Sequence, residues 1–209
     1  MITFQHIRQA IALPQYFDGL DAQMQMAPVG RARMQPNPDN PPRQSAVLLL
    51  IYPKLGEGLH LILTKRTSQL RGHSGQVSFP GGRRDPEDPT YEATALRETC
   101  EELGICGERI EIIGRLNKLW IPPSNFDVYP VVGLMQREPQ ITPSPAEVEK
   151  VLHMPLSALV DDITKQVTQM DFRGQAIDVP YYDVQGHIVW GATCMMLSEF
   201  EQRLLKVLG

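Results

Sequence analysis

The sequence predicts an α+β fold built on a mixed, mostly antiparallel sheet with few helices. Runs of apolar or β-branched residues of strand length recur along the chain, whereas helical periodicity is confined to a few segments. The 209 residues suit one domain with small additions and are enough to bury a sizeable core. With 42% hydrophobic and 21% charged residues, the composition is ordinary for a soluble globular protein.

The net charge and the lack of a recognisable membrane span or secretory signal limit the partners that we expect. The net charge of −4 provides no global basic field, so we expect no nucleic-acid partner. No apolar stretch reaches the about 18 residues that span a membrane. The N-terminus lacks the basic start and apolar run of a secretory signal. We therefore expect no membrane partner and a location in a reducing cytoplasm.

The three cysteines, Cys100, Cys106 and Cys194, are an odd and sparse set. Their spacing matches neither a metal-ligand motif nor a disulfide framework. We interpret them as small hydrophobic side chains of the interior.

The first 44 residues differ from the rest of the chain. Residues 2–13 carry apolar side chains at helical spacing and predict a short amphipathic helix. Residues 14–44 are rich in Pro, Arg and Asn, which predicts an irregular arm outside the core. The sequence thus predicts an N-terminal helix and Pro-rich arm over 1–44 and a folded domain over 45–209. Such an arm needs a surface to order it, and the partner subunit of a homodimer would supply one.

The folded domain begins with a predicted hairpin. Residues 45–53 form a continuous apolar run, which is typical of a buried strand. A Leu-Gly-Glu-Gly turn leads from it into a second strand over 59–66. Three later runs, enriched in β-branched or aromatic residues, predict strands over 110–120, 128–135 and 147–156.

The chain is predicted to end in a hairpin followed by a helix. Residues 176–191 have the pattern of two short strands, with Gln185 and Gly186 at the tip of the turn. The residues after them keep apolar side chains at helical spacing. We expect Met195 and Met196 on that helix to pack in the core.

An acidic helix is predicted between the early and the late strands. Asp88 followed by Pro89 indicates an N-cap and a first helical position, and Gly104 indicates the stop. The helix is then expected over roughly 89–103. A helical wheel separates an apolar side from an acidic side. The apolar side holds Ala93, Leu96, Cys100 and Leu103, and the acidic side holds Glu98, Glu101 and Glu102.

The acidic side has two interpretations. It is either an ordinary solvated face with an excess of Glu or a site for a hard cation. Like charges three and four residues apart repel by about a few tenths of a kcal/mol per pair, and a divalent ion would turn that repulsion into attraction. Mg²⁺ is held by carboxylate oxygens and by substrate phosphates. The double glycine Gly81-Gly82 before the helix favours the second interpretation, because glycines let the main chain approach a ligand closely.

The stretch from Gly82 to Ile105 resembles the signature of the Nudix hydrolases. That signature is Gly, five residues, Glu, seven residues, Arg-Glu, an apolar residue, any residue, Glu-Glu, any residue, Gly and an apolar residue. The matching positions are Gly82, Asp88, Arg97, Glu98, Glu101, Glu102, Gly104 and Ile105. The chain departs from the signature in three ways: Asp88 replaces Glu, eight residues instead of seven precede Arg97, and Thr99 replaces the apolar residue.

Residues 62–82 also resemble the pattern of the coenzyme A pyrophosphatase branch of this family. The pattern is Leu-Leu-Thr-x-Arg, Ser or Ala, three residues, Arg, three residues, Gly, three residues and Phe-Pro-Gly-Gly. The positions in register are Thr64, Arg66, Arg71, Gly75, Phe79, Pro80, Gly81 and Gly82. Ile62 and Thr67 are mild departures.

The resemblance implies a Nudix-type α/β/α sandwich with a mixed sheet and the loop-helix of the signature. It implies metal-dependent hydrolysis of the diphosphate bond of coenzyme A or acyl-coenzyme A, with Mg²⁺ or Mn²⁺ as cofactor. The products would be 3′,5′-ADP and 4′-phosphopantetheine or its acyl form. The alternatives are another nucleoside diphosphate derivative as substrate, such as ADP-ribose, and a Nudix domain that binds a ligand without turnover.

The resemblance also implies roles for individual residues. The metal ligands carry over to Glu98 and Glu102, supported by Glu101 and by the carbonyl of Gly81. Arg97 is expected to orient Glu101 or its neighbours within the catalytic group.

Other residues are expected around this centre. Glu147, where a loop meets a predicted strand, is the candidate general base, with Glu149 as the second choice and exposed loop acids as the alternative for both. The candidate substrate contacts are Arg66, Arg71, His73 and Gly82. Arginine forms forked bonds to phosphate oxygens, although a surface salt bridge is the alternative for each arginine.

Overall fold

The computed structural model describes residues 1–13, 17–31, 35–68, 75–106, 109–172 and 174–209. The helices are α1 Phe4–Ile11, α2 Gly19–Met24, α3 Tyr91–Leu103, α4 Leu156–Leu159 and α5 Gly191–Leu208, with a 3₁₀ turn, η2, at Asp162–Thr164. The strands are β1 Arg43–Lys54, β2 Gly58–Arg66, β3 Val77–Ser78, β4 Gly81–Arg83, β5 Glu111–Arg115, β6 Leu119–Ile121, β7 Phe126–Leu134, β8 Val148–Pro155, β9 Lys165–Phe172, β10 Gln175–Val184 and β11 His187–Trp190.

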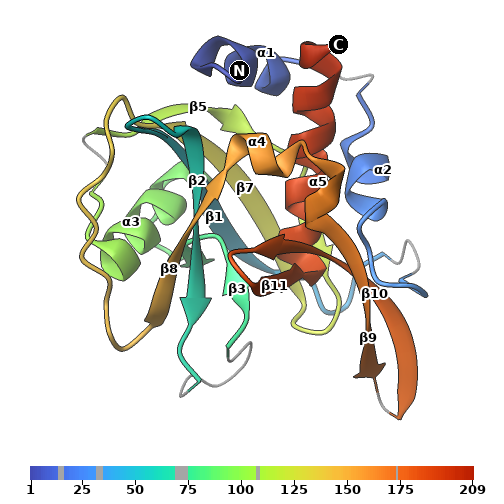
Figure 1. Cartoon of the computed structure of the whole chain (residues 1–209). Coiled ribbons are helices and arrows are strands. Elements are labelled where there is room, and N and C mark those ends of the chain that lie inside the picture. The colour runs from blue at the N-terminus through green and yellow to red at the C-terminus, as the bar shows by residue number, and fades with distance from the viewer. Residues whose placement is uncertain (14–16, 32–34, 69–74, 107–108, 173) are drawn as a thin grey trace.

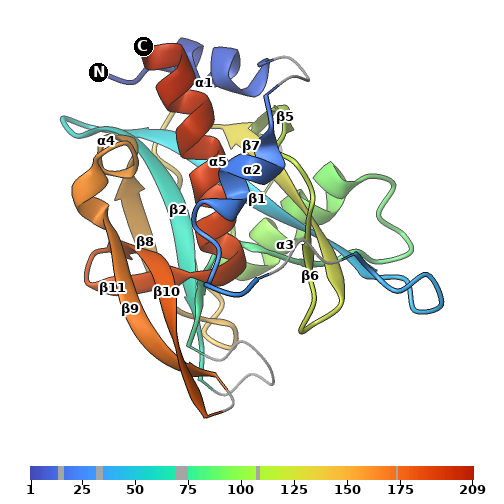
Figure 2. The ribbon, with the colours of Figure 1, turned by 90° about the vertical axis from the view of Figure 1, so that its right-hand side faces the viewer.

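These elements form an α/β/α sandwich around a mixed sheet, which confirms the predicted fold class. The main sheet runs β3-β2-β1-β7-β5, with β4 paired to β1, β6 to β7 and β8 to β2. Helix α3 lies on one side of this sheet, and α5, with α1 and α2 beside it, lies on the other (Figures 1 and 2). A smaller sheet, β11-β10-β9, projects beside the lower end of α5 (Figure 1).

Strand β1 is the centre of the molecule. It pairs in parallel with β7 and antiparallel with β2 and β4. Leu48 and Leu50 belong to the core under α3, whereas Leu49 and Ile51 belong to the core under α5. Because both faces of β1 are covered, its sequence is a continuous apolar run, as is usual for central strands of layered folds.

The predicted strand over 110–120 is in fact two strands, β5 and β6. The chain leaves the ladder at Asn117, whose backbone N–H donates to the carboxylate of Glu199 on α5 at 3.0 Å. Because the Glu199 carboxylate, which is buried and distant in sequence, binds Asn117, β5 ends here and the chain turns out of the ladder. The predicted strands at 45–53, 59–66, 128–135 and 147–156 match β1, β2, β7 and β8 to within a few residues.

The expectation that residues 14–44 lie outside the core is wrong. Helix α2 falls within this segment, and Ala22 and Met26 are buried. The amide of Gln23 is also buried and donates to Glu199 on α5 at 2.8 Å. Ser198 on α5 donates to the carbonyl of Ala22 at 2.7 Å. This part of the arm is therefore ordered by α5 of its own chain.

The C-terminal predictions are confirmed. Strands β10 and β11 pair antiparallel, and the turn between them contains Gln185 and Gly186, both with positive φ. That conformation suits a tight hairpin turn. Met195 and Met196 are buried on α5.

The cysteine prediction is wrong for one pair. Cys100 and Cys106 form a disulfide, with their Cα atoms 4.5 Å apart. Gly104, at φ 69°, ends α3 and turns the chain back, which brings Cys106 over the end of the helix. Cys194 is free and buried, as expected.

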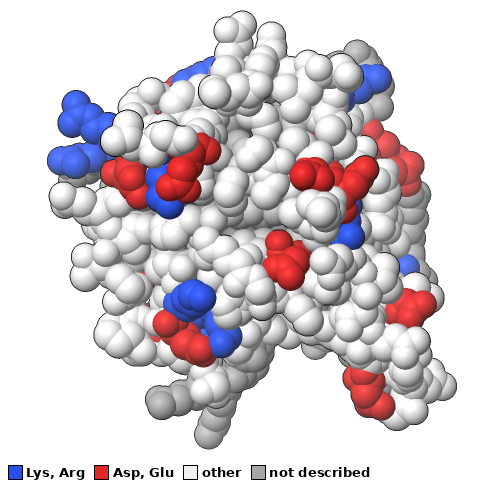
Figure 3. Space-filling model, viewed as in Figure 1, with Lys and Arg blue, Asp and Glu red and all other residues white. Residues whose placement is uncertain are grey.

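The surface has a mixed charge distribution. On the face in Figure 3, positive and negative side chains are interspersed among neutral ones, without a broad basic area. Within the described ranges, no helix is long and apolar enough to cross a membrane.

Candidate active site

The acidic helix α3 begins later than predicted. Thr90, and not Asp88, caps it, because the Thr90 hydroxyl accepts from the backbone N–H of Ala93 at 3.2 Å. Asp88 is buried, at 7% exposure, and its carboxylate accepts from Arg97 Nε at 3.2 Å and Nη2 at 2.9 Å. The bonded guanidinium lowers the pKa of Asp88 to about 2. The predicted stop at Gly104 is confirmed.

The side of the helix that faces the sheet is rotated from the one the wheel indicated, although Leu103 is buried as expected. Glu102 is buried, at 2% exposure, alongside Ala95 and Thr99, whereas Leu96 and Cys100 are half-buried. Thr99 occupies the signature's apolar position without an unpaired hydroxyl, because it donates to the carbonyl of Ala95 at 2.7 Å. One carboxylate of the acidic side therefore lies between helix and sheet.

Arg97 connects the acidic residues to one another. Its Nη1 donates to Glu98 Oε1 at 2.9 Å and to Glu101 Oε2 at 3.1 Å. Its Nη2 also donates to the carbonyl of Arg83 in β4. The guanidinium thus bonds two carboxylates of α3 and, through its other N–H groups, Asp88.

The double glycine allows α3 to approach the sheet. Strand β4 pairs antiparallel with β1, and Gly82 lies directly under Glu98. A Cβ on Gly82 would be 2.4 Å from the carboxyl carbon of Glu98. A Cβ on Gly81 would be 2.4 Å from the carbonyl oxygen of Ala46. Any side chain at either position would displace the carboxylate or the strand.

Glu102 is the most perturbed carboxylate of the site. Burial raises its pKa to about 8, and the charges of Glu147 and Glu98 add to the effect while Arg66 opposes it. Arg66 Nη1 lies 3.6 Å from Glu102 Oε1. The other oxygen, Oε2, is buried and has no hydrogen-bond partner among the described residues.

Glu98 and Glu147 belong to the same group of neighbouring acidic side chains as Glu102. Burial raises the pKa of Glu98, Arg97 opposes the shift, and the charges of Glu101 and Glu147 add to it. Backbone hydrogen bonds to two other parts of the chain hold the segment that contains Glu147 close to Glu102. The backbone N–H of Thr67 donates to the Glu147 carbonyl at 3.0 Å, and that of Ser144 donates to the Glu102 carbonyl at 2.8 Å.

The remaining predicted residues divide into two groups. Arg66 lies beside Glu102, Gly82 lies beside Glu98, and the backbone of Gly81 adjoins Glu102. Glu149 instead forms an ion pair with Lys65, and its side chain is 45% exposed. Arg71 and His73 lie outside the described residues.

The carboxylates fit a divalent cation, although they do not form a ready-made cage. Within the described ranges, no group of three or more His, Cys, Asp or Glu converges on one point. Glu98 and Glu101 instead accept from Arg97. The unpartnered oxygen of Glu102, next to two further carboxylates, is the type of donor that a hard cation binds.

The sandwich fold, with an Arg- and Glu-rich helix against a double-glycine strand, defines a Nudix-type hydrolase. The NUDIX domain model matches residues 42–171, and the chain belongs to this family. Its curated relatives are named Nudix hydrolases, and this chain is an enzyme that hydrolyses phosphorus-containing anhydrides.

Individual proteins agree with this assignment. The Nudix hydrolase NudL of Photorhabdus laumondii is 37% identical over 162 residues, which are 78% of this chain and 85% of that protein. The chloroplastic Nudix hydrolase 22 of Arabidopsis thaliana is 33% identical over 162 residues, which are 75% of this chain and 53% of the plant protein. This chain therefore spans about half the length of the plant relative. The MutT protein structure from Methanosarcina mazei has a TM-score of 0.52 at 17% identity, covering 81% of this chain and 97% of that one, and shows the same fold.

Substitution of Gly82 by Ala is expected to lower hydrolase activity roughly 10²-fold, because displacement of a catalytic group by about 1 Å has effects of that size. The new methyl group would overlap the Glu98 carboxylate. Activity on a diphosphate substrate and thermal unfolding should be measured together. In a Glu98→Gln background, the same substitution should cause little further loss of activity. If the losses of activity in Gly82→Ala and Glu98→Gln are fully additive, the predicted overlap between the new methyl group and the Glu98 carboxylate is wrong.

Proposed function

We propose that this enzyme hydrolyses the diphosphate bond of coenzyme A or acyl-coenzyme A. Water adds to one phosphorus, the P–O–P bond breaks, and the products are 3′,5′-ADP and 4′-phosphopantetheine or its acyl form. The observation that carries the proposal is the 62–82 pattern, which ends in Gly81 and Gly82. These two glycines lie against β1 and the Glu98 carboxylate. This proximity of the pattern's last two residues to a proposed metal ligand supports the proposal.

Mg²⁺ or Mn²⁺ is the proposed cofactor. Glu98 and Glu102 would hold the ion, supported by Glu101 and the carbonyl of Gly81. When bound, such an ion neutralises diphosphate charge and activates water. Two observations support this site. Arg97 donates to Glu98 and Glu101, and one oxygen of Glu102 is buried without a hydrogen-bond partner among the described residues.

Arg66 is the proposed phosphate contact nearest the carboxylates. Its contact with Glu102, at 3.6 Å, is too long for a tight hydrogen bond. The Arg66 side chain is about a quarter exposed, at 27%, so a substrate phosphate could reach it. Arg71, His73 and Gly82 complete the proposed substrate contacts, as the resemblance implies.

Purified enzyme is expected to release 3′,5′-ADP from coenzyme A when Mg²⁺ or Mn²⁺ is added, and to lose this activity with a chelator. The assay should compare coenzyme A, an acyl-coenzyme A, ADP-ribose and a dinucleoside polyphosphate, with kcat/KM as the measure. Much faster turnover of ADP-ribose or the dinucleoside polyphosphate would overturn the substrate proposal. Binding of coenzyme A without turnover of any substrate would favour a ligand-binding domain.

A further inference from the structure

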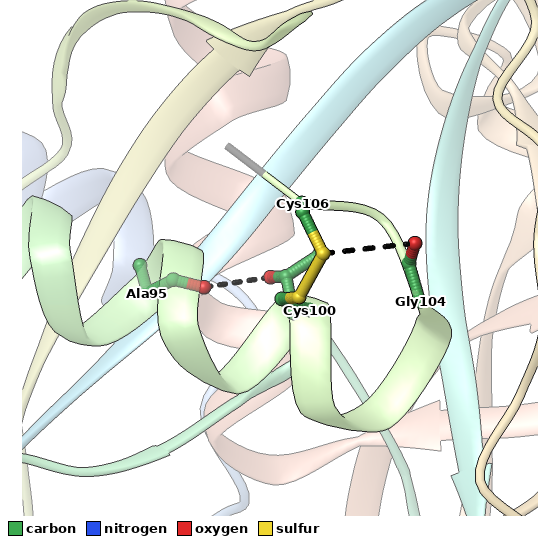
Figure 4. Close-up of a disulfide and its surroundings, with 5 residues drawn as sticks. Ala95, Cys100, Gly104 and Cys106 are labelled. Atoms are coloured by element: carbon green, nitrogen blue, oxygen red, sulfur yellow. Dashed lines mark hydrogen bonds between the residues drawn. A yellow bond between two sulfur atoms is a disulfide. The ribbon is translucent and has the colours of Figure 1, made fainter. Parts of the chain in front are cut away.

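The end of the catalytic helix carries a disulfide that the proposed mechanism does not use. The Cys100–Cys106 bond closes the C-terminal turn of α3, and Gly104 lies inside the closed loop (Figure 4). The backbone N–H of Gly104 donates to the carbonyl of Cys100 at 2.9 Å. Cys106 is exposed and Cys100 is half-buried. A small thiol can therefore reach the bond from solvent, and exposed disulfides are the ones that exchange readily.

The turn closed by this disulfide also holds the segment that leads to Glu147. The backbone N–H of Thr142 donates to the carbonyl of Leu103, and that of Ser144 donates to the carbonyl of Glu102, both at 2.8 Å. The carbonyl of Ser144 in turn accepts from the backbone N–H of Glu147 at 3.1 Å. The last turn of α3 thus carries Glu102 and also provides the acceptors that place Glu147 beside it.

We propose that Cys100 and Cys106 form a reversible thiol–disulfide switch that controls the position of Glu147 relative to Glu102. In the oxidised state the closed loop holds the turn and its two carbonyl acceptors in place. In the reduced state the turn gains conformational freedom, because the covalent constraint on a short loop is removed. The regulatory role rests on the proposed metal-dependent function, whereas the redox chemistry itself does not.

The redox step is an ordinary thiol–disulfide exchange. A dithiol attacks one sulfur of the Cys100–Cys106 bond, and a mixed disulfide forms. The second thiol of the reductant then displaces the remaining cysteine. One S–S bond breaks in the protein and one forms in the reductant, while both cysteines end as thiols. A low-molecular-weight disulfide reverses the reaction with the same balance.

Alkylation of the folded protein tests the redox chemistry without any substrate. After treatment with oxidised glutathione and removal of the reagent, iodoacetamide should leave Cys100 and Cys106 unlabelled. After dithiothreitol, it should label both. Trypsin cleavage after Arg97 and Arg109 places the two cysteines in one peptide for mass spectrometry. Complete labelling of both thiols after the oxidised-glutathione treatment would overturn the switch.

The coupling to the site is tested by amide hydrogen exchange and by Mn²⁺ binding. Reduction is expected to speed exchange at Thr142 and Ser144 and to weaken Mn²⁺ binding by at least about fivefold, the lower range of typical coupling between sites. Reoxidation should restore both values. Unchanged exchange and unchanged Mn²⁺ affinity would overturn the regulatory part.

Two variants provide matched controls. Cys106→Ser should behave like the reduced wild type and ignore dithiothreitol, and its unfolding temperature shows whether it is folded. Cys194→Ala, which alters the buried free cysteine, should keep the full redox response. A response to dithiothreitol that persists in Cys106→Ser would assign the effect to another group. If coenzyme A is not hydrolysed but labelling and exchange still respond, the proposed substrate fails and the switch stands.

Discussion

Substitution of Glu102 by Gln is expected to lower kcat/KM roughly 10³-fold or more. A metal ligand supports several kcal/mol of transition-state charge stabilisation, and each 1.4 kcal/mol corresponds to about a factor of ten in rate. Glu102 supplies a buried oxygen with no partner among the described residues, and Gln cannot provide that negative charge. Initial rates over a range of Mg²⁺ concentrations measure the effect. Glu87→Gln, the same change at an exposed position before the helix, is the control and should retain wild-type activity.

The pH dependence of stability and of metal affinity distinguishes the effect of the Glu102 charge from the effect of its packing. The pKa of Glu102 in the folded, metal-free protein is about 8, against an ordinary value of 4.5. The folded state therefore binds this proton more tightly than the unfolded state, so the contribution of Glu102 to stability falls as pH rises from about 4.5 to about 8. Metal binding must displace the proton, so affinity rises over the upper part of this range. Both trends should weaken in Glu102→Gln. Identical pH profiles for the two proteins would contradict the assigned environment.

Substitution of Glu147 by Gln is expected to lower kcat by about 10³-fold, within the range of general-base effects. The structure places this residue close enough to Glu98 and Glu102 for its charge to raise the pKa of both. Such a group can accept a proton from attacking water. Loss of the base should lower kcat with a smaller change in KM.

The neighbouring acid Glu149 provides the matched control. It lies two residues further along the chain, in β8, and forms an ion pair with Lys65. Glu149→Gln should leave kcat and the pH–rate profile near wild type. If the two variants lose equal activity, or if Glu149→Gln loses more, Glu147 is not the base.

The sequence predicted those parts of the fold whose signals are local. The apolar run of β1, the turn at Gln185 and Gly186 and the amphipathic C-terminal helix appear where their patterns indicated. Strand β9 was not predicted because it is short of apolar residues and is largely exposed. Helix α2 was not predicted because it is stabilised by α5, which lies near the other end of the chain. Gln23 of α2 donates a hydrogen bond to Glu199 of α5.

The site shows the same division between local and distant effects. The Arg97–Glu102 spacing and the double glycine were visible in the sequence, and they lie together in the structure. The capping role given to Asp88 was wrong because a cap signal does not show that an arginine nine residues later will compete for the carboxylate. The burial of Glu102 could not be read from a wheel, which has no information about which side meets the sheet. The disulfide was missed because the turn at Gly104 sets the distance between the two cysteines, and their spacing alone does not.

The buried hydrogen bond between Gln23 and Glu199 joins two parts of the chain that both lie outside the range of the family match. The family match covers residues 42–171, yet one core contains side chains from α1, from α2 and from α5, on both sides of that range. If the matched range were cut out, the face of the main sheet that α5 covers would lose its cover. The range that the family model matches is thus smaller than the packed core. The catalytic helix therefore depends for its support on parts of the chain that its signature does not include.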